Sequence, residues 1–266
     1  MTLEQQPHQT ASNGFQSGSA YYELSRPKYP LESIDFIKTI IPVNGKVVDL
    51  GAGTGIMTKF LVEVCQYQVT AVEPVEGMRE KLLAAVPGVK AVNGTSWNTT
   101  LPSNSQDAVI VAQAFHWFDD LKSLQEIHRI LKPEGHLLLI WNMESKKNCR
   151  WVEELRNLYE FYDAAAPQYR KNQWQNVWAT KEASDLFNVP LQHKQFDYPM
   201  PFIRQRIFPR ILSKSYIAIL PKSEQDELEK KVNAVLNNPE YGFDADPVTG
   251  EFIYPHDTDL YWTQKK

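Results

Sequence analysis

The chain has 266 residues, 42% of them hydrophobic, and a formal net charge of −4 at pH 7. This ordinary apolar fraction excludes general disorder, which requires low hydrophobicity and high net charge. A mildly acidic chain also lacks the clustered Lys and Arg that nucleic acids attract. We therefore expect a folded protein that does not bind nucleic acid.

The cysteine content and the N-terminal sequence further limit the class of protein. Cys65 and Cys149 lie far apart, with no Cys or His at metal-ligand spacing around them, so we expect neither a disulfide framework nor a metal site. Residues 1–20 are polar, without the basic start and apolar core of a signal peptide, and predict a flexible tail. The longest apolar run, Leu137–Trp141, is too short to span a bilayer. Together these features predict a soluble, cytoplasmic protein without a membrane partner.

Residues 32–141 alternate between short runs rich in β-formers and longer amphipathic runs. This alternation predicts right-handed βαβ units, and therefore a mostly parallel, doubly wound α/β sheet with helices on both faces. Ligands of such sheets bind beyond the carboxyl ends of the strands. The predicted strands are 46–50, 68–73, 89–92, 107–112 and 136–141, and the predicted helices are 55–66, 77–86 and 119–131.

Residues 143–266 have a less regular pattern, which predicts helices at 151–166 and 222–237, a strand at 195–198 and an alternating edge strand at 258–263. We expect this half to complete the sheet and to add a helical insert that acts as a lid. Aromatic and basic side chains in the insert suggest a small organic acid or planar anion as substrate, but they also fit a core and a solvated face. These side chains are Tyr169, Trp174, Trp178, Phe202, Phe208, Arg204, Arg206 and Arg210.

The strongest local motif is the loop Asp49–Gly55 (DLGAGTG), which follows a predicted buried strand and opens a helix. Glycines let a backbone approach a ligand closely, and a helix N-terminus presents N–H groups without partners. Glu73 ends the next strand, where a carboxylate can accept both hydroxyls of a ribose. Together they indicate a cofactor that contains a nucleoside. A tight strand-to-helix turn without a ligand is the alternative for the loop alone.

The glycine spacing distinguishes between nucleoside cofactors. The loop reads G-x-G-x-G, and its third glycine comes one position earlier than in the dinucleotide fingerprint G-x-G-x-x-G. Asp49 would repel a pyrophosphate but suits a cationic amine or sulfonium. No Walker A lysine is present. These features favour S-adenosylmethionine over NAD, ATP or FAD.

Several motifs resemble the class I S-adenosylmethionine-dependent methyltransferases, specifically the small-molecule branch called methyltransferase domain type 11. They are VVDLGAGTGIMTKFL, AVEP, AQAFHWFD, LKPEG, YYELSRPKYP and SKSYIAILP. The resemblance covers about residues 15–264. It implies a single domain over residues 21–266 with a Rossmann-like, seven-stranded sheet whose C-terminal strand is antiparallel. Residues 21–142 would form the cofactor-binding core, and residues 143–266 would complete the sheet and carry the substrate insert.

The resemblance also implies roles for single residues. Asp49 and the loop backbone would hold the methionine part of the cofactor, and Glu73 would hold the ribose. Trp97 stands where the family has an acid near the adenine, so the backbone of Thr95 and Ser96 would serve there. The implied cofactor-binding residues are Tyr22, Arg26, Asp49, Gly51, Ala52, Gly53, Gly55, Glu73, Pro74, Met78, Thr95, Ser96, Gln113, Ala114 and Phe115.

His116 titrates near neutral pH and lies just beyond a predicted strand end, which makes it the candidate catalytic base. An imidazole packed inside the aromatic cluster around it is the alternative. The predicted reaction is methyl transfer to a small organic molecule, at a carboxylate or hydroxyl oxygen first and at carbon second. A non-catalytic or regulatory S-adenosylmethionine-binding protein, a nucleic-acid methyltransferase and an NAD-linked oxidoreductase are the alternatives.

Overall fold

The computed structural model describes residues 27–163 and 166–266. Within them, seven strands form one sheet: β1 (Lys46–Leu50), β2 (Gln68–Val72), β3 (Lys90–Val92), β4 (Gln106–Ala112), β5 (Leu131–Glu144), β6 (Gln192–Ile203) and β7 (Glu251–Gln264). Their order across the sheet is β3-β2-β1-β4-β5-β7-β6. Only β7 runs antiparallel to its neighbours, β5 and β6, and the pairs among β1 to β5 are parallel. The predicted doubly wound fold is confirmed.

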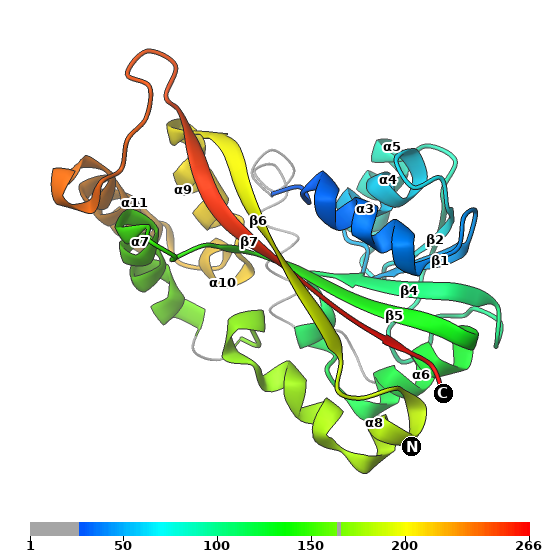
Figure 1. Ribbon diagram of the computed structural model, residues 1–266. Helices are drawn as coiled ribbons and strands as arrows, with labels where there is room; N and C mark the ends of the chain where they lie inside the picture. Colours follow the sequence, from blue (N-terminus) through cyan, green and yellow to red (C-terminus); the bar gives the residue numbers. More distant parts are fainter. Residues whose placement is uncertain (1–26, 164–165) are drawn as a thin grey trace.

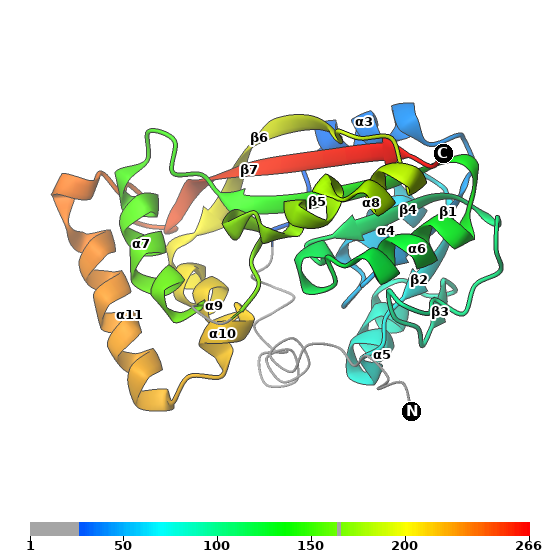
Figure 2. The same ribbon diagram turned by 90° about the horizontal axis from the view of Figure 1, so that it is seen from below.

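Helices alternate with strands in the first half of the chain, and most of the later ones gather at one end of the molecule (Figures 1 and 2). The earlier helices are α3 (Leu31–Ile40), α4 (Ile56–Glu63), α5 (Glu76–Ala85) and α6 (Leu121–Ile130). The later helices are α7 (Arg150–Glu160), α8 (Lys181–Leu186), α9 (Ile207–Leu212), α10 (Ser215–Ala218) and α11 (Lys222–Asn237). No helix in the described ranges has the length and apolar character needed to cross a membrane.

Side chains that alternate along the strands build one apolar core on each face of the sheet. On one face, Ile37 of α3 and Leu61 of α4 belong to the same buried cluster as Val47 of β1. On the other face, Ile127 of α6 belongs to a cluster with Val48, the next residue of β1. Both faces of β1 are therefore buried, which explains why the successive residues Val47 and Val48 are both apolar.

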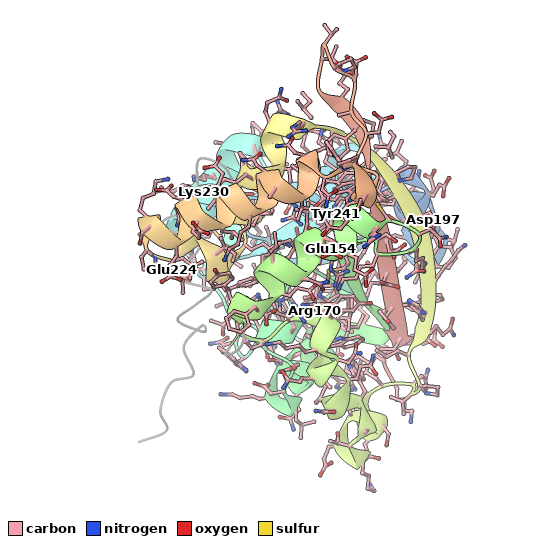
Figure 3. All side chains as sticks on the ribbon, turned by 90° about the vertical axis from the view of Figure 1, so that its left-hand side faces the viewer. Glu154, Arg170, Asp197, Glu224, Lys230 and Tyr241 are labelled. Atoms are coloured by element: carbon pink, nitrogen blue, oxygen red, sulfur yellow. The ribbon has the colours of Figure 1, made fainter. Side chains whose placement is uncertain are left out.

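A third apolar cluster joins the later helices to the far ends of β6 and β7. It contains Val152 of α7, Ile211 of α9, Val232 of α11 and Tyr254 of β7. Helices α7 and α11 lie side by side in Figure 3, with the charged side chains of Glu224 and Lys230 on the exposed surface of α11. The helical insert is present, and its role as a lid stays a prediction.

The prediction that residues 258–263 form an edge strand is wrong. They belong to β7, which pairs on both sides, while β6 is the edge strand and is longer than the predicted 195–198. The polar residues that suggested an edge are paired inside the sheet. Thr258 donates to the side chain of Asn142 at 2.6 Å, and the Asp259 carboxylate accepts from Gln195 at 3.0 Å.

The helix predicted over residues 151–166 ends earlier, at Glu160, and a short 3₁₀ turn follows over Phe161–Asp163. The buried Asp163 carboxylate forms ion pairs with Arg170 and with Lys171. These pairs hold Arg170 and Lys171 beside the 3₁₀ turn, where Asp163 is bound by side chains and no longer belongs to the helix.

A substitution at Gly55 tests how tightly the glycine loop after β1 packs against α5. Gly55 has a left-handed φ of 90°, and an added Cβ would lie 2.9 Å from Leu82 Cγ. We expect Gly55→Ala to lower the free energy of unfolding by about 2–4 kcal/mol, because backbone strain and overpacking add. Urea unfolding would measure the change. Gly77→Ala in α5 is the control, because nothing lies within 4 Å of its added Cβ. Equal losses in both variants would contradict the expectation.

Candidate active site

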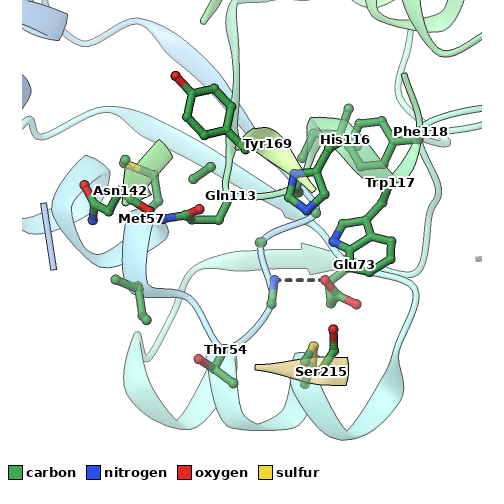
Figure 4. Close-up of a pocket in the computed structure, with 18 of the residues that line it drawn as sticks. Thr54, Met57, Glu73, Gln113, His116, Trp117, Phe118, Asn142, Tyr169 and Ser215 are labelled. Carbon is green, nitrogen blue, oxygen red and sulfur yellow. Dashed lines mark hydrogen bonds between the residues drawn. The ribbon is translucent and has the colours of Figure 1, made fainter. Parts of the chain in front are cut away.

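A cavity opens where the loops after β1, β2, β3, β4 and β5 meet (Figure 4). This is the position that a doubly wound sheet predicts for a ligand. The second half of the chain closes the cavity with side chains from α7, α9 and α10 and from the segments that flank them. The described lining residues of the first half are 27, 29, 50–54, 56–57, 72–75, 78, 94–97, 112–114 and 116–118.

The glycine loop lies against the end of β2. Gly53 N–H donates to Glu73 Oε2 at 2.8 Å, and Val75 N–H donates to Oε1 at 2.9 Å (Figure 4). Gly53 has a left-handed φ of 56°, and only the Met78 sulfur, at 4.0 Å, would meet a Cβ added there. The loop therefore presents bare backbone to the cavity beside a fixed carboxylate.

Asp49 is a buried carboxylate behind this loop and does not itself line the cavity. Its Oδ2 accepts from the Thr58 hydroxyl at 2.5 Å, and its Oδ1 is buried without a partner. Burial raises the pKa of Asp49 to about 7; the Thr58 hydrogen bond opposes this shift, and the nearby Glu73 charge adds to it. Burial also raises the pKa of Glu73, against its two backbone hydrogen bonds. A cationic group nearby would stabilise the ionised form of both acids.

Most of the predicted cofactor-binding residues line this one cavity. They are Gly51, Ala52, Gly53, Glu73, Pro74, Met78, Thr95, Ser96, Gln113 and Ala114. Gly55 instead packs against Leu82 at the start of α4, and Phe115 is fully buried in the core, its ring 5.9 Å from that of Trp178. Tyr22 and Arg26 lie outside the described residues.

Trp97, which replaces the family's acid near the adenine, lines the cavity beside Thr95 and Ser96. Its indole N–H donates to Asp120 Oδ2 at 2.8 Å. Asp120 also caps α6 by accepting from Ser123 N–H at 2.8 Å. The indole ring is therefore held in place and offers the cavity an apolar wall rather than a charge.

His116 lies in a short 3₁₀ turn after β4 and lines the cavity. Its Nδ1 accepts a hydrogen bond from Trp141 Nε1 at 3.2 Å. An indole N–H can only donate, so Nδ1 carries no proton and the neutral ring carries its proton on Nε2. With this bond in place His116 has a donor at Nε2, and its one unprotonated nitrogen faces Trp141. The catalytic base role stays a prediction, and this geometry opposes it.

Three cavity residues that the sequence reasoning missed follow the predicted end of the fifth strand. Asn142, Met143 and Glu144 all line the cavity, because β5 continues three residues beyond Trp141. The sequence could have predicted these residues, because ligands bind at the carboxyl ends of the strands and the residues after Trp141 lie at such an end.

The second half contributes cavity residues to which the sequence analysis gave no individual role. Tyr159 on α7 and Lys214, Ser215 and Tyr216 around the start of α10 line the cavity, as does the predicted aromatic Tyr169. Of the three predicted arginines only Arg210 lines it. Arg204 donates to Asn237 at 2.7 Å at the surface, and the indole rings of Trp174 and Trp178 belong to the core.

Comparisons with known proteins agree with this geometry. Residues 48–139 match the model of a methyltransferase domain family. An uncharacterized methyltransferase of Mycobacterium bovis is 43% identical over 145 residues, which are 54% of this chain and 58% of that protein. An uncharacterized methyltransferase-like protein of Schizosaccharomyces pombe is 27% identical over 223 residues, 83% of this chain and 85% of that protein. The chain is therefore similar to methyltransferases, most clearly over residues 48–139.

A solved structure shares the methyltransferase fold over most of the chain. It is a protein of Anabaena variabilis assigned as a methyltransferase of an antibiotic biosynthesis pathway, with a TM-score of 0.59 at 22% identity, and the match covers 89% of this chain and 98% of that one. The match to the mycobacterial methyltransferase spans less than two thirds of that relative's length. The family model also ends at residue 139, before the second-half residues of the cavity.

The Trp141 hydrogen bond predicts the protonation state of His116. We expect His116 Nδ1 to be unprotonated at pH 7, which long-range ¹H–¹⁵N NMR spectra would show directly. Trp141→Phe removes the donor and should allow both tautomers. His193, whose Nε2 lies 2.8 Å from Asp259 Oδ1, serves as the control and should keep its tautomer in the variant. A proton on Nδ1 in the unmodified protein would refute the assignment.

Proposed function

We propose that the protein transfers the methyl group of S-adenosylmethionine to an oxygen of a small organic molecule. The observation that carries the proposal is the pair of buried carboxylates, Asp49 and Glu73, at the ends of the adjacent strands β1 and β2. The glycine loop between them presents backbone to the cavity. Similarity to a methyltransferase domain family over residues 48–139 supports the same reaction.

The residues of the cavity fit this cofactor. A carboxylate offers about four acceptor positions, so Glu73 can accept ribose hydroxyls in addition to its two backbone N–H groups. The unpartnered Oδ1 of Asp49 suits the positive charge of a methionine ammonium group near the loop. Pro74 and Met78 offer apolar surface to an adenine. When bound, the cofactor supplies an electrophilic methyl group on a sulfonium.

For the transfer itself the chain contributes alignment and a dry cavity. Gln113 is held by a 3.0 Å hydrogen bond from its Nε2 to the Asn142 carbonyl, so its position on the wall is fixed. Trp117 and Phe118 supply aromatic walls that exclude water. Alignment of reactants contributes about 7–11 kcal/mol in favourable intramolecular cases. A dry, low-dielectric site also favours a step in which an anion and a cation neutralise each other.

The protonation states on the wall favour an acceptor that is already ionised. Glu144 is buried, which opposes ionisation, but Lys214 and Arg210 hold the pKa of its carboxyl well below the usual range. It is therefore a weak base. The unprotonated nitrogen of His116 is occupied by Trp141. A carboxylate acceptor needs no base, so it is favoured over a hydroxyl and over carbon.

Cofactor binding should depend on pH through Asp49. Its pKa is about 7, so about one tenth of the ligand-free protein has it ionised at pH 6 and about nine tenths at pH 8. A cationic ligand binds the ionised form of Asp49. We therefore expect the Kd for S-adenosylmethionine, measured by calorimetry, to be about tenfold higher at pH 6 than at pH 8. The Asp49→Asn variant should bind S-adenosylmethionine more weakly at pH 8, and its Kd should lose this dependence on pH. Titration of the ligand itself affects the variant and the unmodified protein equally. The same pH profile in both proteins would exclude the role of Asp49.

Transfer of a labelled methyl group tests the function. We expect S-adenosylmethionine with a labelled methyl group to label small molecules of a metabolite extract, and not added RNA. Glu73→Ala should raise the cofactor Kd by a factor that corresponds to about 1–3 kcal/mol, the loss expected for hydrogen bonds to a charged group. Glu80→Ala, at an exposed position of α5, is the matched control. Label in RNA alone, or in nothing, would overturn the proposal.

A further inference from the structure

Charged side chains gather in the part of the cavity that the second half of the chain builds. Glu144 ends β5, Tyr159 lies on α7, Arg210 on α9, and Lys214 directly before α10, and all four line the cavity. Arg210 Nη2 lies 2.9 Å and Lys214 Nζ 3.1 Å from Glu144 Oε1. Arg210 exposes only 3% of its surface. The cavity wall therefore contains one buried cation, Arg210, and one partly buried cation, Lys214.

Cations outnumber carboxylates in this region. Among the described residues, the carboxylates of Glu144, Glu160 and Asp163 form ion pairs with six cations: Lys146, Arg156, Arg170, Lys171, Arg210 and Lys214. Figure 3 shows Arg170 near the end of α7. The whole chain carries a net charge of −4, so the positive excess is local. Buried cations are stable only with compensating negative charge or hydrogen-bond acceptors, which an anionic ligand would add.

Two donors of the same cluster lack partners. The Tyr159 hydroxyl and the Arg210 Nε are buried without a hydrogen bond among the described residues. A guanidinium keeps its proton in proteins, and burial, together with Glu144, raises the pKa of the Tyr159 phenol well above its usual range. Both groups therefore remain donors. A buried donor without an acceptor costs about 1–3 kcal/mol, so the cluster is suited to an oxygen ligand.

We propose that the methyl acceptor is a small organic acid and that a carboxylate of this acid binds at the cluster of Arg210, Lys214 and Tyr159. This assignment rests on the proposed methyl transfer. A planar guanidinium matches the geometry of a carboxylate, and the tyrosine hydroxyl adds a neutral donor. Glu144 already neutralises part of the charge of Arg210 and Lys214, so the remaining charge suits a monoanion better than a phosphate.

The cluster selects and orients the acid rather than activating it. A carboxylate bound to a guanidinium and an ammonium is a weak nucleophile, because both cations stabilise its charge. The oxygen that receives the methyl group is then a second group of the same molecule. Arg210, Lys214 and Tyr159 are accordingly specificity residues, and their loss should raise the KM for the acid more than it lowers kcat.

Fractionation of the extract tests the substrate class. An anion exchanger separates the metabolite extract into a retained fraction and a flow-through, and each receives the protein with methyl-labelled S-adenosylmethionine. We expect label in the retained fraction, and we expect it to persist after treatment of that fraction with phosphatase. Label in the flow-through alone, or loss of labelling after phosphatase treatment, would overturn the carboxylate assignment and leave methyl transfer intact. Transfer to neither fraction would overturn methyl transfer, and this proposal with it.

Variants test the binding site with the same retained fraction. Tyr159→Phe removes a hydroxyl without a partner, so the protein should keep or raise its Tm, while the half-saturating amount of the fraction rises about 5–20-fold. Lys214→Met should raise the half-saturating amount of the retained fraction at least about tenfold. Cofactor Kd should not change in either variant. A merely structural role would lower Tm and leave the half-saturating amount unchanged, which would refute the proposal.

Matched controls exist outside the cavity. Tyr67→Phe removes a buried hydroxyl that donates to the Ile41 carbonyl at 3.4 Å, on the other face of the sheet. Lys147→Met removes an exposed lysine that pairs with Asp257 at 3.4 Å. Both should leave the half-saturating amount unchanged. An increase in these controls equal to that in the cavity variants would also contradict the assignment.

Discussion

The hydrogen bond from Gly53 N–H to the Glu73 carboxylate joins the loop after β1 to the end of β2, and the cavity depends on it. The parallel register that pairs Leu50 with Val72 brings both strand ends to the same height. The Gly51 N–H then donates to the Val72 carbonyl at 2.9 Å, so the loop is tied to β2 at two points. Side chains larger than hydrogen at these left-handed positions would strain the turn. The sheet thus determines where the backbone and the carboxylate meet, before any ligand is present.

This arrangement buries two like charges, and the burial explains the electrostatics of the site. Asp49 and Glu73 both have raised pKa values, first because they are buried, and each needs a positive partner to ionise fully. Thr58 and the backbone N–H groups of Gly53 and Val75 supply hydrogen bonds, and the charge of Arg79 opposes the rise only for Glu73. The acids are therefore the natural partners of a cationic cofactor. Burial without a cation beside Asp49 makes the ligand-free protein sensitive to pH.

The sequence predicted the first half well, because its signals are local. Strand β1 contains the successive apolar residues Val47 and Val48, and Glu73 and the glycine loop are recognised by their places next to strand ends. Prediction failed where an assignment depends on distant partners. The alternation in β7 suggested an edge because the sequence does not show that Thr258 meets Asn142, more than one hundred residues away. Tyr159 and Arg210 meet only because α7 and α9 pack together against β7, which no local pattern reveals.

The two halves of the chain give the cavity opposite electrostatic character. The first half supplies Asp49 and Glu73 without cations of equal number, and the second half supplies more cations than carboxylates around Glu144. A cationic cofactor would complete the first half, and the anchoring carboxylate of the acceptor would complete the second. Because these groups are buried, salt screens them little, and their fields persist inside the cavity. The polarity of the walls would therefore orient both reactants before they meet, which is the alignment that an in-line displacement requires.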